Sequence, residues 1–504
     1  MSLPSQQDAP SLPEAGIPVG PSLPSLSALS QRGVAFIAAR YGASSMVQAG
    51  NVLVLTWWIG PRAYGAFVTA VGVTTFLSSI TRLGLDTHLV RSEEAPTRED
   101  YDTAFTLILS ISLLLCLLGG LALPLLNLWL RDHSFTVPYL ALLVTIPLIG
   151  LAGPPLAKLE RALAFRDVAQ IEFGGQLSAF VVSAILAWRG FGVWAPVSGH
   201  IVWQVFVLVG AQRVSHFVPR ISFELSHARR MINFGLGFSA SVRIWQLRSL
   251  VNPLIVGRFL GTEAVAFVAL AVRAVEALAF VRTAVGRVAI AALSRLREDP
   301  ERCREMMQKG ARWQLFALGP AFCLLALLGP RFLPTLLGTR WSSVVLIFPF
   351  IAAAALTNSV FVLEASALFV EGQQWVVTRA YLWHIVIFAF GTFALTPRMG
   401  IAGYGWAEVC ACLPYAILHR ELARNLRVSL RTVLPWLAAF VAVLLSAGVA
   451  ASSRWVLFLP LAAMVGWQLR NFFASRSLRT ASAKAPPQWE WFAQSSRSTG
   501  SSGD

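Results

Sequence analysis

Apolar segments long enough to cross a lipid bilayer recur along almost the whole chain. A transmembrane helix needs about 20 predominantly apolar residues, and a window of about 19 residues finds about fourteen such segments. Only 13% of the residues are charged, about half the share usual in soluble proteins. The sequence therefore predicts an all-α polytopic membrane protein. We expect its helices near residues 34–57, 65–87, 103–126, 137–156, 170–188, 191–211, 232–256, 263–286, 311–330, 342–368, 379–396, 400–418, 432–450 and 454–470.

Positive charge is concentrated in one set of loops. About 28 of the 41 Lys and Arg residues lie in the termini and in the connections after even-numbered segments, against about 8 after odd-numbered ones. The positive-inside rule therefore places both termini in the cytoplasm. The net charge is +16, but the basic residues are spread over short loops rather than gathered in one patch. Nucleic acid is therefore not an expected partner.

The two ends of the chain and its cysteines give no sign of a catalytic centre. Residues 1–30 are rich in Pro and Ser and lack the regions of a signal peptide, and residues 471–504 are polar, so we expect cytoplasmic tails. The five cysteines indicate neither a disulfide framework nor a zinc site. The sequence shows no nucleotide-binding, metalloprotease or serine-hydrolase motif. We expect no cofactor, no bound metal and no enzymatic activity.

A weak internal repeat divides the predicted helices into two sets. Residues 59–65, IGPRAYG, resemble residues 260–266, LGTEAVA, and each segment joins two predicted helices. This predicts two six-helix lobes over residues 31–212 and 213–420, with two further helices over residues 421–470 appended. Transporters built from such repeats bind substrate where the repeats meet.

Polar side chains follow one face of the predicted helix that ends near Gly257. Ser239, Arg243, Gln246, Ser249 and Asn252 follow one another at steps of three or four residues, and Arg248 lies between them. An intramembrane arginine costs about 2.5–3.5 kcal/mol, so it should face protein or water. A polar seam that holds two helices together is the alternative interpretation.

Further arginines lie in other predicted spans. Arg40, Gln48 and Asn51 share one face of the first helix, and Arg273 lies three residues before Glu276, so these two can pair. Arg82 can pair with Asp86 or reach the membrane surface, and Arg282 can also reach it; lining a cavity is the alternative for both.

Four arginines are the best candidates for an anion path. Leaving all four unpaired at the bilayer centre would cost about 10–14 kcal/mol, and a water-filled cavity that admits an anion relieves this cost. The guanidinium fork binds phosphate oxygens in pairs and never loses its proton. We therefore expect Arg40, Arg243, Arg248 and Arg273 to line a path for an anion. Polar cavity positions are Gln48, Asn51, Gln246 and Asn252. Glu276 and Glu364 are candidates for ion coupling.

Several short segments in order resemble a known family. They are the Ile59-Gly60-Pro61 turn with Tyr64-Gly65, residues 82–86 (RLGLD), residues 159–166 (LERALAFR), residues 190–195 (GFGVWA) and the stretch from Phe234 to Gly261. Together they resemble bacterial polysaccharide transporters, the Wzx-type oligosaccharide-lipid flippases of the multidrug/oligosaccharidyl-lipid/polysaccharide exporter superfamily. One departure is that relatives often carry an acidic residue shortly after the asparagine of helix seven, where this chain has Pro253 and Leu254.

The resemblance implies a flippase of the bacterial inner membrane. It would move undecaprenyl-diphosphate-linked oligosaccharides to the outer leaflet by alternating access, for exopolysaccharide, capsule or O-antigen synthesis. With this substrate, the anion bound by the four arginines is the diphosphate. Membrane lipids would surround it, and a polysaccharide polymerase or co-polymerase is a candidate protein partner. The alternatives are a drug or cation antiporter of the same superfamily, a lipid II flippase and, less favoured because the outer loops are short, a membrane polymerase or glycosyltransferase.

Overall fold

The computed structural model describes residues 44, 46–48, 50–92, 95–224, 227–229, 231, 244–279, 299–449 and 466. Residues 50–58 are helical, and every regular element that follows within the described residues is also a helix. The first set comprises α2 (Pro61–Thr81), α3 (Leu85–Arg91), α4 (Arg98–Leu121), α5 (Leu123–Leu130), α6 (Thr136–Leu142), α7 (Thr145–Leu151), α8 (Gly153–Arg161), α9 (Phe165–Trp188) and α10 (Trp194–Ser215).

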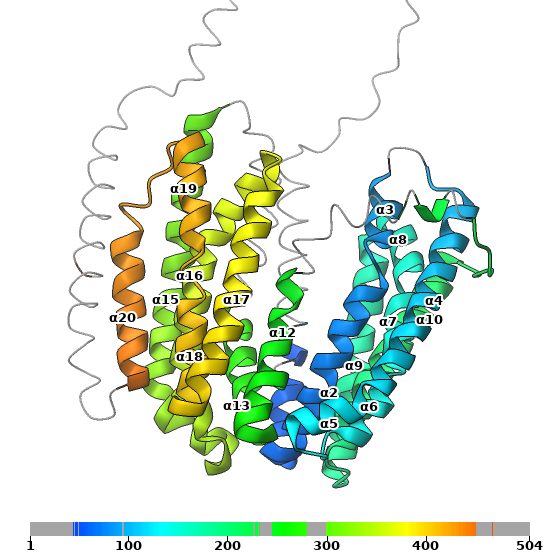
Figure 1. Cartoon of the computed structure of the whole chain (residues 1–504), viewed down its shortest axis with the longest axis horizontal. Helices are drawn as coiled ribbons and strands as arrows, with labels where there is room; N and C mark the ends of the chain where they lie inside the picture. The colour runs from blue at the N-terminus through cyan, green and yellow to red at the C-terminus, as the bar shows by residue number, and fades with distance from the viewer. Residues whose placement is uncertain are drawn as a thin grey trace, which may run out of the picture. The chain divides into compact units, whose positions relative to one another are not determined.

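The second set begins after the residues that the structure leaves undescribed before Ile244. It comprises α12 (Arg248–Val251), η1 (Asn252–Val256), α13 (Gly257–Leu278), α15 (Pro300–Leu337), η2 (Thr339–Trp341), α16 (Ser343–Val370), α17 (Gln374–Met399), α18 (Ile401–Cys410), α19 (Tyr415–Asn425) and α20 (Leu434–Val449). Figure 1 shows both sets.

Ten helical segments of the described residues are long and apolar enough to span a membrane, and Leu434–Gly448 is a shorter apolar helix. The prediction of an all-α polytopic membrane protein is therefore confirmed. The predicted helix at 454–470 and the first part of that at 34–57 lie outside the described residues, so the count of about fourteen stays a prediction.

Several helices differ from the apolar runs that predicted them. The run at 311–330 is the central part of α15, which begins at Pro300 with an Asp299 N-cap. Hydropathy marks only the part of a helix that lies in lipid, and here the helix continues into a basic segment that includes Cys303. The predicted helix at 137–156 is divided among α6, α7 and α8, and that at 400–418 between α18 and α19.

A sharp bend separates the predicted helices at 232–256 and 263–286. Gly261 has φ +80° and ψ 178° inside α13, a conformation that favours glycine because it lacks a Cβ atom. A π-helical turn, η1, precedes the bend at Asn252–Val256. Pro253 lies inside that turn and cannot donate a backbone hydrogen bond.

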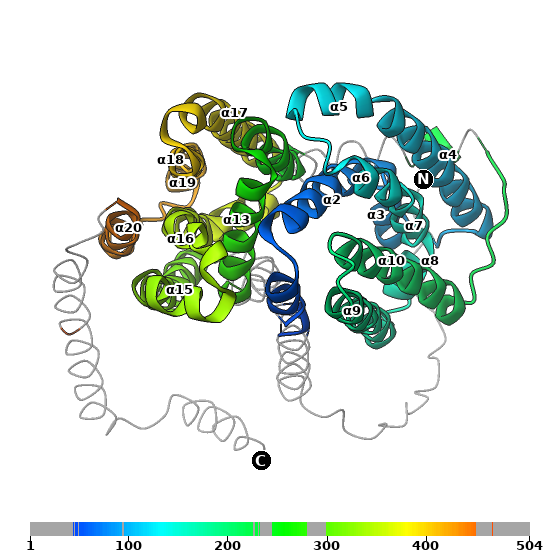
Figure 2. The same cartoon turned by 90° about the horizontal axis from the view of Figure 1, so that it is seen from below.

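The two segments of the sequence repeat pack against each other where α2 crosses α13. A Cβ atom added to Gly65 would lie 1.8 Å from the carbonyl oxygen of Thr262 and 3.4 Å from Cβ of Ala266. The helices approach this closely only because position 65 has no side chain. Figure 2 shows α2 beside α13, α9 beside α10 and α15 beside α16.

We expect Gly65→Ala to destabilise the protein by about 1–3 kcal/mol, the usual cost of overpacking. The Cβ atom of the new alanine would clash with the Thr262 backbone. Thermal unfolding in detergent measures the effect. Gly50→Ala is the matched control, because a Cβ atom at that helical position meets no atom of the described residues within 4 Å. Equal unfolding temperatures for the two variants would contradict the close approach of α2 and α13.

Candidate functional site

The predicted site residues are only partly within the described residues. Arg40 and Arg243 lie outside them, and so does Arg282. The polar positions Gln48 and Gln246 are exposed, whereas Asn51 and Asn252 are half-buried. Arg248, Asn252 and Arg273 lie within the described residues, in α12, η1 and α13.

Arg248 forms an ion pair that the sequence did not predict. Its Nη2 donates to Oε1 of Glu408, near the C-terminal end of α18. The Glu408 side chain is 2% exposed and that of Arg248 is 28% exposed. The guanidinium carbon also lies 5.6 Å from the ring centre of Trp245 and 5.5 Å from that of Phe388. Arg248 is thus held between a buried carboxylate and two aromatic rings.

A row of polar side chains continues from Glu408 along α18 and α19. Tyr415 and His419 follow Glu408 by seven and eleven residues, which places all three on one helix face. Tyr415 accepts a hydrogen bond of 2.6 Å from Nδ2 of Asn358 on α16. Its ring stacks on that of His384 on α17, with centres 5.3 Å apart and planes at 16°.

The row ends at a second buried carboxylate. Nδ1 of His419 lies 2.8 Å from Oε1 of Glu364, whose side chain is 2% exposed. Glu364 was predicted as a candidate for ion coupling, but its partner was missed because the predicted helix ended at residue 418. The spacing of Glu408, Tyr415 and His419 was the available signal, although the break between α18 and α19 weakened it.

Arg273 and Glu276 pair on α13 as their spacing suggested. Nη1 of Arg273 lies 3.2 Å from Oε2 of Glu276, and the side chains are 56% and 51% exposed. Arg273 also interacts electrostatically with Tyr64 on α2 and His200 on α10. The pair is therefore exposed although it lies within an apolar helix.

Asn51 and Asn252 occupy equivalent positions in the predicted repeat, because the offset that aligns Gly60 with Gly261 aligns them too. Nδ2 of Asn252 donates a 3.2 Å hydrogen bond to the carbonyl oxygen of Val265, so this amide holds η1 against α13. Within the described residues, neither asparagine Oδ1 has a hydrogen-bond partner.

Arg82 pairs with Asp86, as the spacing of four residues suggested. Its Nη1 lies 3.5 Å from Oδ2 of Asp86, and its Nη2 donates to the backbone carbonyl of Ile149.

Hydrogen bonds join the first set of helices to the second near the predicted outer surface. Oδ2 of Asp132 accepts a 2.9 Å hydrogen bond from Thr262, and Trp129 Nε1 donates to the carbonyl of Leu254. Burial alone would raise the pKa of Asp132. The backbone and side chain of Ser134, the Thr262 hydroxyl and the charge of Arg62 together lower it below the ordinary value.

We expect the contribution of the Asp132 carboxylate to stability to be the same at pH 8 and pH 5. A group with a lowered folded pKa stabilises fully above its unfolded pKa, about 3.9, and loses that effect as the pH falls through the folded value. The difference in unfolding temperature between wild type and Asp132→Asn should thus stay constant down to pH 5 and shrink below about pH 4. A difference that changes between pH 6 and 8 would contradict this assignment.

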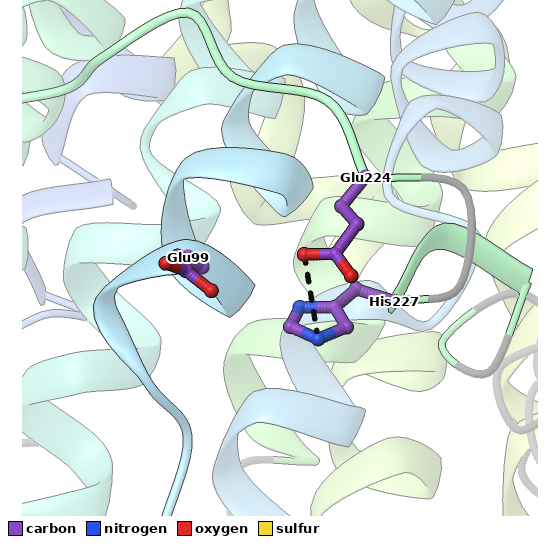
Figure 3. A group of neighbouring side chains, drawn as sticks. All are labelled: Glu99, Glu224 and His227. Atoms are coloured by element: carbon purple, nitrogen blue, oxygen red, sulfur yellow. Dashed lines mark ion pairs between the residues drawn. The ribbon is translucent and has the colours of Figure 1, made fainter.

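Three potential metal ligands gather at the start of α4, within the part of the chain that the structure describes. The ligand atoms of Glu99, Glu224 and His227 lie within 4.8 Å of one another (Figure 3). Nε2 of His227 lies 3.7 Å from Oε2 of Glu224, and its Nδ1 lies 3.2 Å from Oδ1 of Asp100. The imidazole is therefore flanked by two carboxylates. Both glutamates are exposed. This arrangement is typical of a surface ion-pair group, and the sequence had predicted no metal site.

Comparison with known proteins places the chain in a family. Residues 54–346 match the family model described as polysaccharide biosynthesis protein, which is more than half of the chain. The chain belongs to this family. The resemblance inferred from the sequence is thereby confirmed at the level of the family, and the matched region includes Arg248, Asn252, Arg273 and the two contacting repeat segments.

One curated relative is the succinoglycan biosynthesis transport protein ExoT of Rhizobium meliloti (strain 1021). It is 28% identical over 297 residues, which are 58% of this chain and 59% of ExoT. The match thus spans about three-fifths of the length of that relative.

Solved structures show the fold. A lipid II flippase MurJ in an inward closed conformation has a TM-score of 0.67 and 14% identity, and the match covers 90% of this chain and 99% of MurJ. An inward-facing multidrug resistance MATE family transporter of the MOP superfamily has a TM-score of 0.58 and 14% identity, over 76% of this chain and 95% of the transporter. At these identities the likeness concerns the fold alone.

Proposed function

We propose that this family member is a flippase that carries undecaprenyl-diphosphate-linked oligosaccharides across the bacterial inner membrane for surface polysaccharide synthesis. It works by alternating access between two six-helix lobes, residues 31–212 and 213–420. Two further helices bring the total to fourteen, and both termini are cytoplasmic. It breaks no covalent bond and needs no cofactor. Membrane lipids surround it, and a polymerase or co-polymerase receives its product.

The position of Arg273 carries this proposal. An arginine and a glutamate lie inside an apolar span, more than half exposed, where contact with lipid tails would cost several kcal/mol. The electrostatic interactions of Arg273 with Tyr64 and His200 favour an orientation toward the other helices instead. A hydrated passage there suits a diphosphate, which arginine binds through paired hydrogen bonds.

The substrate-binding positions are Arg40, Arg243, Arg248 and Arg273, and the polar cavity positions are Gln48, Asn51, Gln246 and Asn252. Glu276 and Glu364 are the candidates for ion coupling. The family match and the ExoT relative support a polysaccharide substrate over lipid II or a cationic drug. The fold does not separate these substrates, because it resembles both a lipid II flippase and a multidrug transporter.

A deletion strain tests the proposed function. We expect loss of the secreted polymer and accumulation of its lipid-linked repeat unit on the cytoplasmic side, both reversed by the wild-type chain. We also expect no rescue of cells depleted of their lipid II flippase and no change in sensitivity to cationic drugs. Rescue of the depleted cells would support a lipid II flippase, and a drug phenotype with normal polymer would support an antiporter.

A further inference from the structure

We propose that Glu408 is a proton-binding site that is filled when a substrate phosphate binds Arg248, so that one proton and one diphosphate bind together. The inference rests on the proposed function, in which Arg248 is a phosphate ligand, and adds to it a residue and an ion. It starts from the ion pair between α12 and α18, helices that lie on either side of α17 (Figure 1).

Arg248 can be reached by a ligand although it is paired. Its side chain is 28% exposed, and its neighbours Gln246 and Ser249 on the same segment are exposed. A guanidinium has five N–H donors. The contact with Glu408 uses Nη2, and Nε is buried, so a ligand would have to bind the terminal guanidinium nitrogens. The stacked Trp245 and Phe388 rings hold the cation in place while its hydrogen-bond partner changes.

Glu408 cannot exchange its contact with Arg248 for contact with solvent, because its side chain is 2% exposed. A buried carboxylate that loses its cation leaves an uncompensated charge, which costs about 3–5 kcal/mol. A doubly charged phosphate group is a stronger acceptor for Arg248 than a single carboxylate. When the phosphate group takes over the Arg248 guanidinium, the Glu408 carboxylate is left as an uncompensated buried charge.

The surroundings of Glu408 supply no replacement cation within the described residues. Tyr404 lies near the carboxyl group, four residues earlier on α18, the thiol of Cys412 donates to the Glu408 backbone carbonyl at 3.6 Å, and α16 brings Asn358, which is bonded to Tyr415. The titratable or charged side chains that face the Arg248–Glu408 pair are therefore His384 from α17, Tyr404 from α18, Cys412 just beyond it and Tyr415 from α19.

The step that restores neutrality is simple protonation. Glu408 takes one proton from water to become a carboxylic acid, Arg248 keeps its charge, and no bond to the substrate forms or breaks. Release of the substrate reverses the exchange, because Arg248 returns to Glu408 and displaces the proton. By linkage, a ligand whose binding takes up one proton binds about tenfold more weakly for each unit rise in pH.

Binding of undecaprenyl diphosphate to the full-length protein in detergent tests the exchange. Calorimetry at pH 8.5, where the diphosphate is fully ionised, in two buffers of different ionisation enthalpy gives the protons taken up. We expect wild type to take up about one proton per ligand. For each unit rise in pH, the affinity of wild type should fall by a factor about ten times larger than the affinity of Glu408→Gln. Glu305→Gln, which alters an exposed acid paired with Lys309, should match wild type.

The outcomes separate the two proposals. Binding by wild type without proton uptake would overturn the exchange and leave the proposed function intact, and so would equal pH slopes for wild type and Glu408→Gln. The absence of any binding of undecaprenyl diphosphate would overturn both. The wild-type proton count does not depend on how well Glu408→Gln folds.

Discussion

Arg248→Ala is expected to destabilise the folded protein by about 3–5 kcal/mol, the usual effect of removing one partner of a buried ion pair. The Glu408 side chain, 2% exposed, would then have no cation beside it, and either the uncompensated charge or the proton uptake that neutralises it costs free energy. Adding Glu408→Gln to Arg248→Ala should recover most of the loss, because the double variant buries no charge. A recovery of this kind distinguishes a charge effect from the loss of packing between Arg248 and the Trp245 ring.

Thermal unfolding in detergent, followed by the reaction of a thiol dye, measures this effect. The chain carries its own reporters, because Cys303 and Cys323 are buried in the folded protein. Arg302→Ala is the matched control: it removes an exposed arginine that lies 3.3 Å from Asp299, and exposed pairs contribute about 0–1 kcal/mol. Wild-type stability of Arg248→Ala would mean that Glu408 carries no charge in the folded protein.

Arg273→Ala is expected to abolish export of the surface polysaccharide while the amount of protein stays nearly normal. The Arg273–Glu276 pair is more than half exposed, so its loss should cost at most about 1 kcal/mol of stability. A hydrogen bond to a charged group contributes about 1.5–3 kcal/mol. Loss of a two-pronged phosphate contact therefore weakens substrate binding by about two to four powers of ten.

Secreted polymer and an immunoblot of the membrane fraction, measured in the deletion strain, report the two quantities separately. Arg273→Lys keeps the charge but not the planar fork, so it should export an intermediate amount. Arg302→Ala again serves as the control, because it also removes an exposed arginine from a pair of spacing three. Normal export by Arg273→Ala would remove this residue from the anion path.

Local features of this protein could be predicted from the sequence because their causes are local. The apolar runs predicted helices, since a bilayer leaves few other ways to satisfy backbone hydrogen bonds. The break at Gly261 followed from a glycine at a repeated turn. The Arg82–Asp86 and Arg273–Glu276 pairs followed from spacings of four and three, which bring side chains together on any helix.

Interactions between distant segments could not be predicted in this way. Arg248 and Glu408 are 160 positions apart, and neither hydropathy nor spacing relates them. The same holds for Glu364 with His419 and for Asp132 with Thr262. Each of these residues was visible as a polar group in or near a span, but its partner depends on which helix faces which.

The sequence by itself determined that the chain crosses a membrane many times and carries arginines where lipid would not tolerate them, because the cost of burying charge depends on the residue and its depth alone. Only the tertiary structure decided how each described arginine is compensated. Helix packing gave Arg248 a buried carboxylate and left Arg273 exposed beside Glu276. That difference gives Arg248 a role in stability beside its proposed role in phosphate binding, and it leaves Arg273 open to an anion in the proposed function.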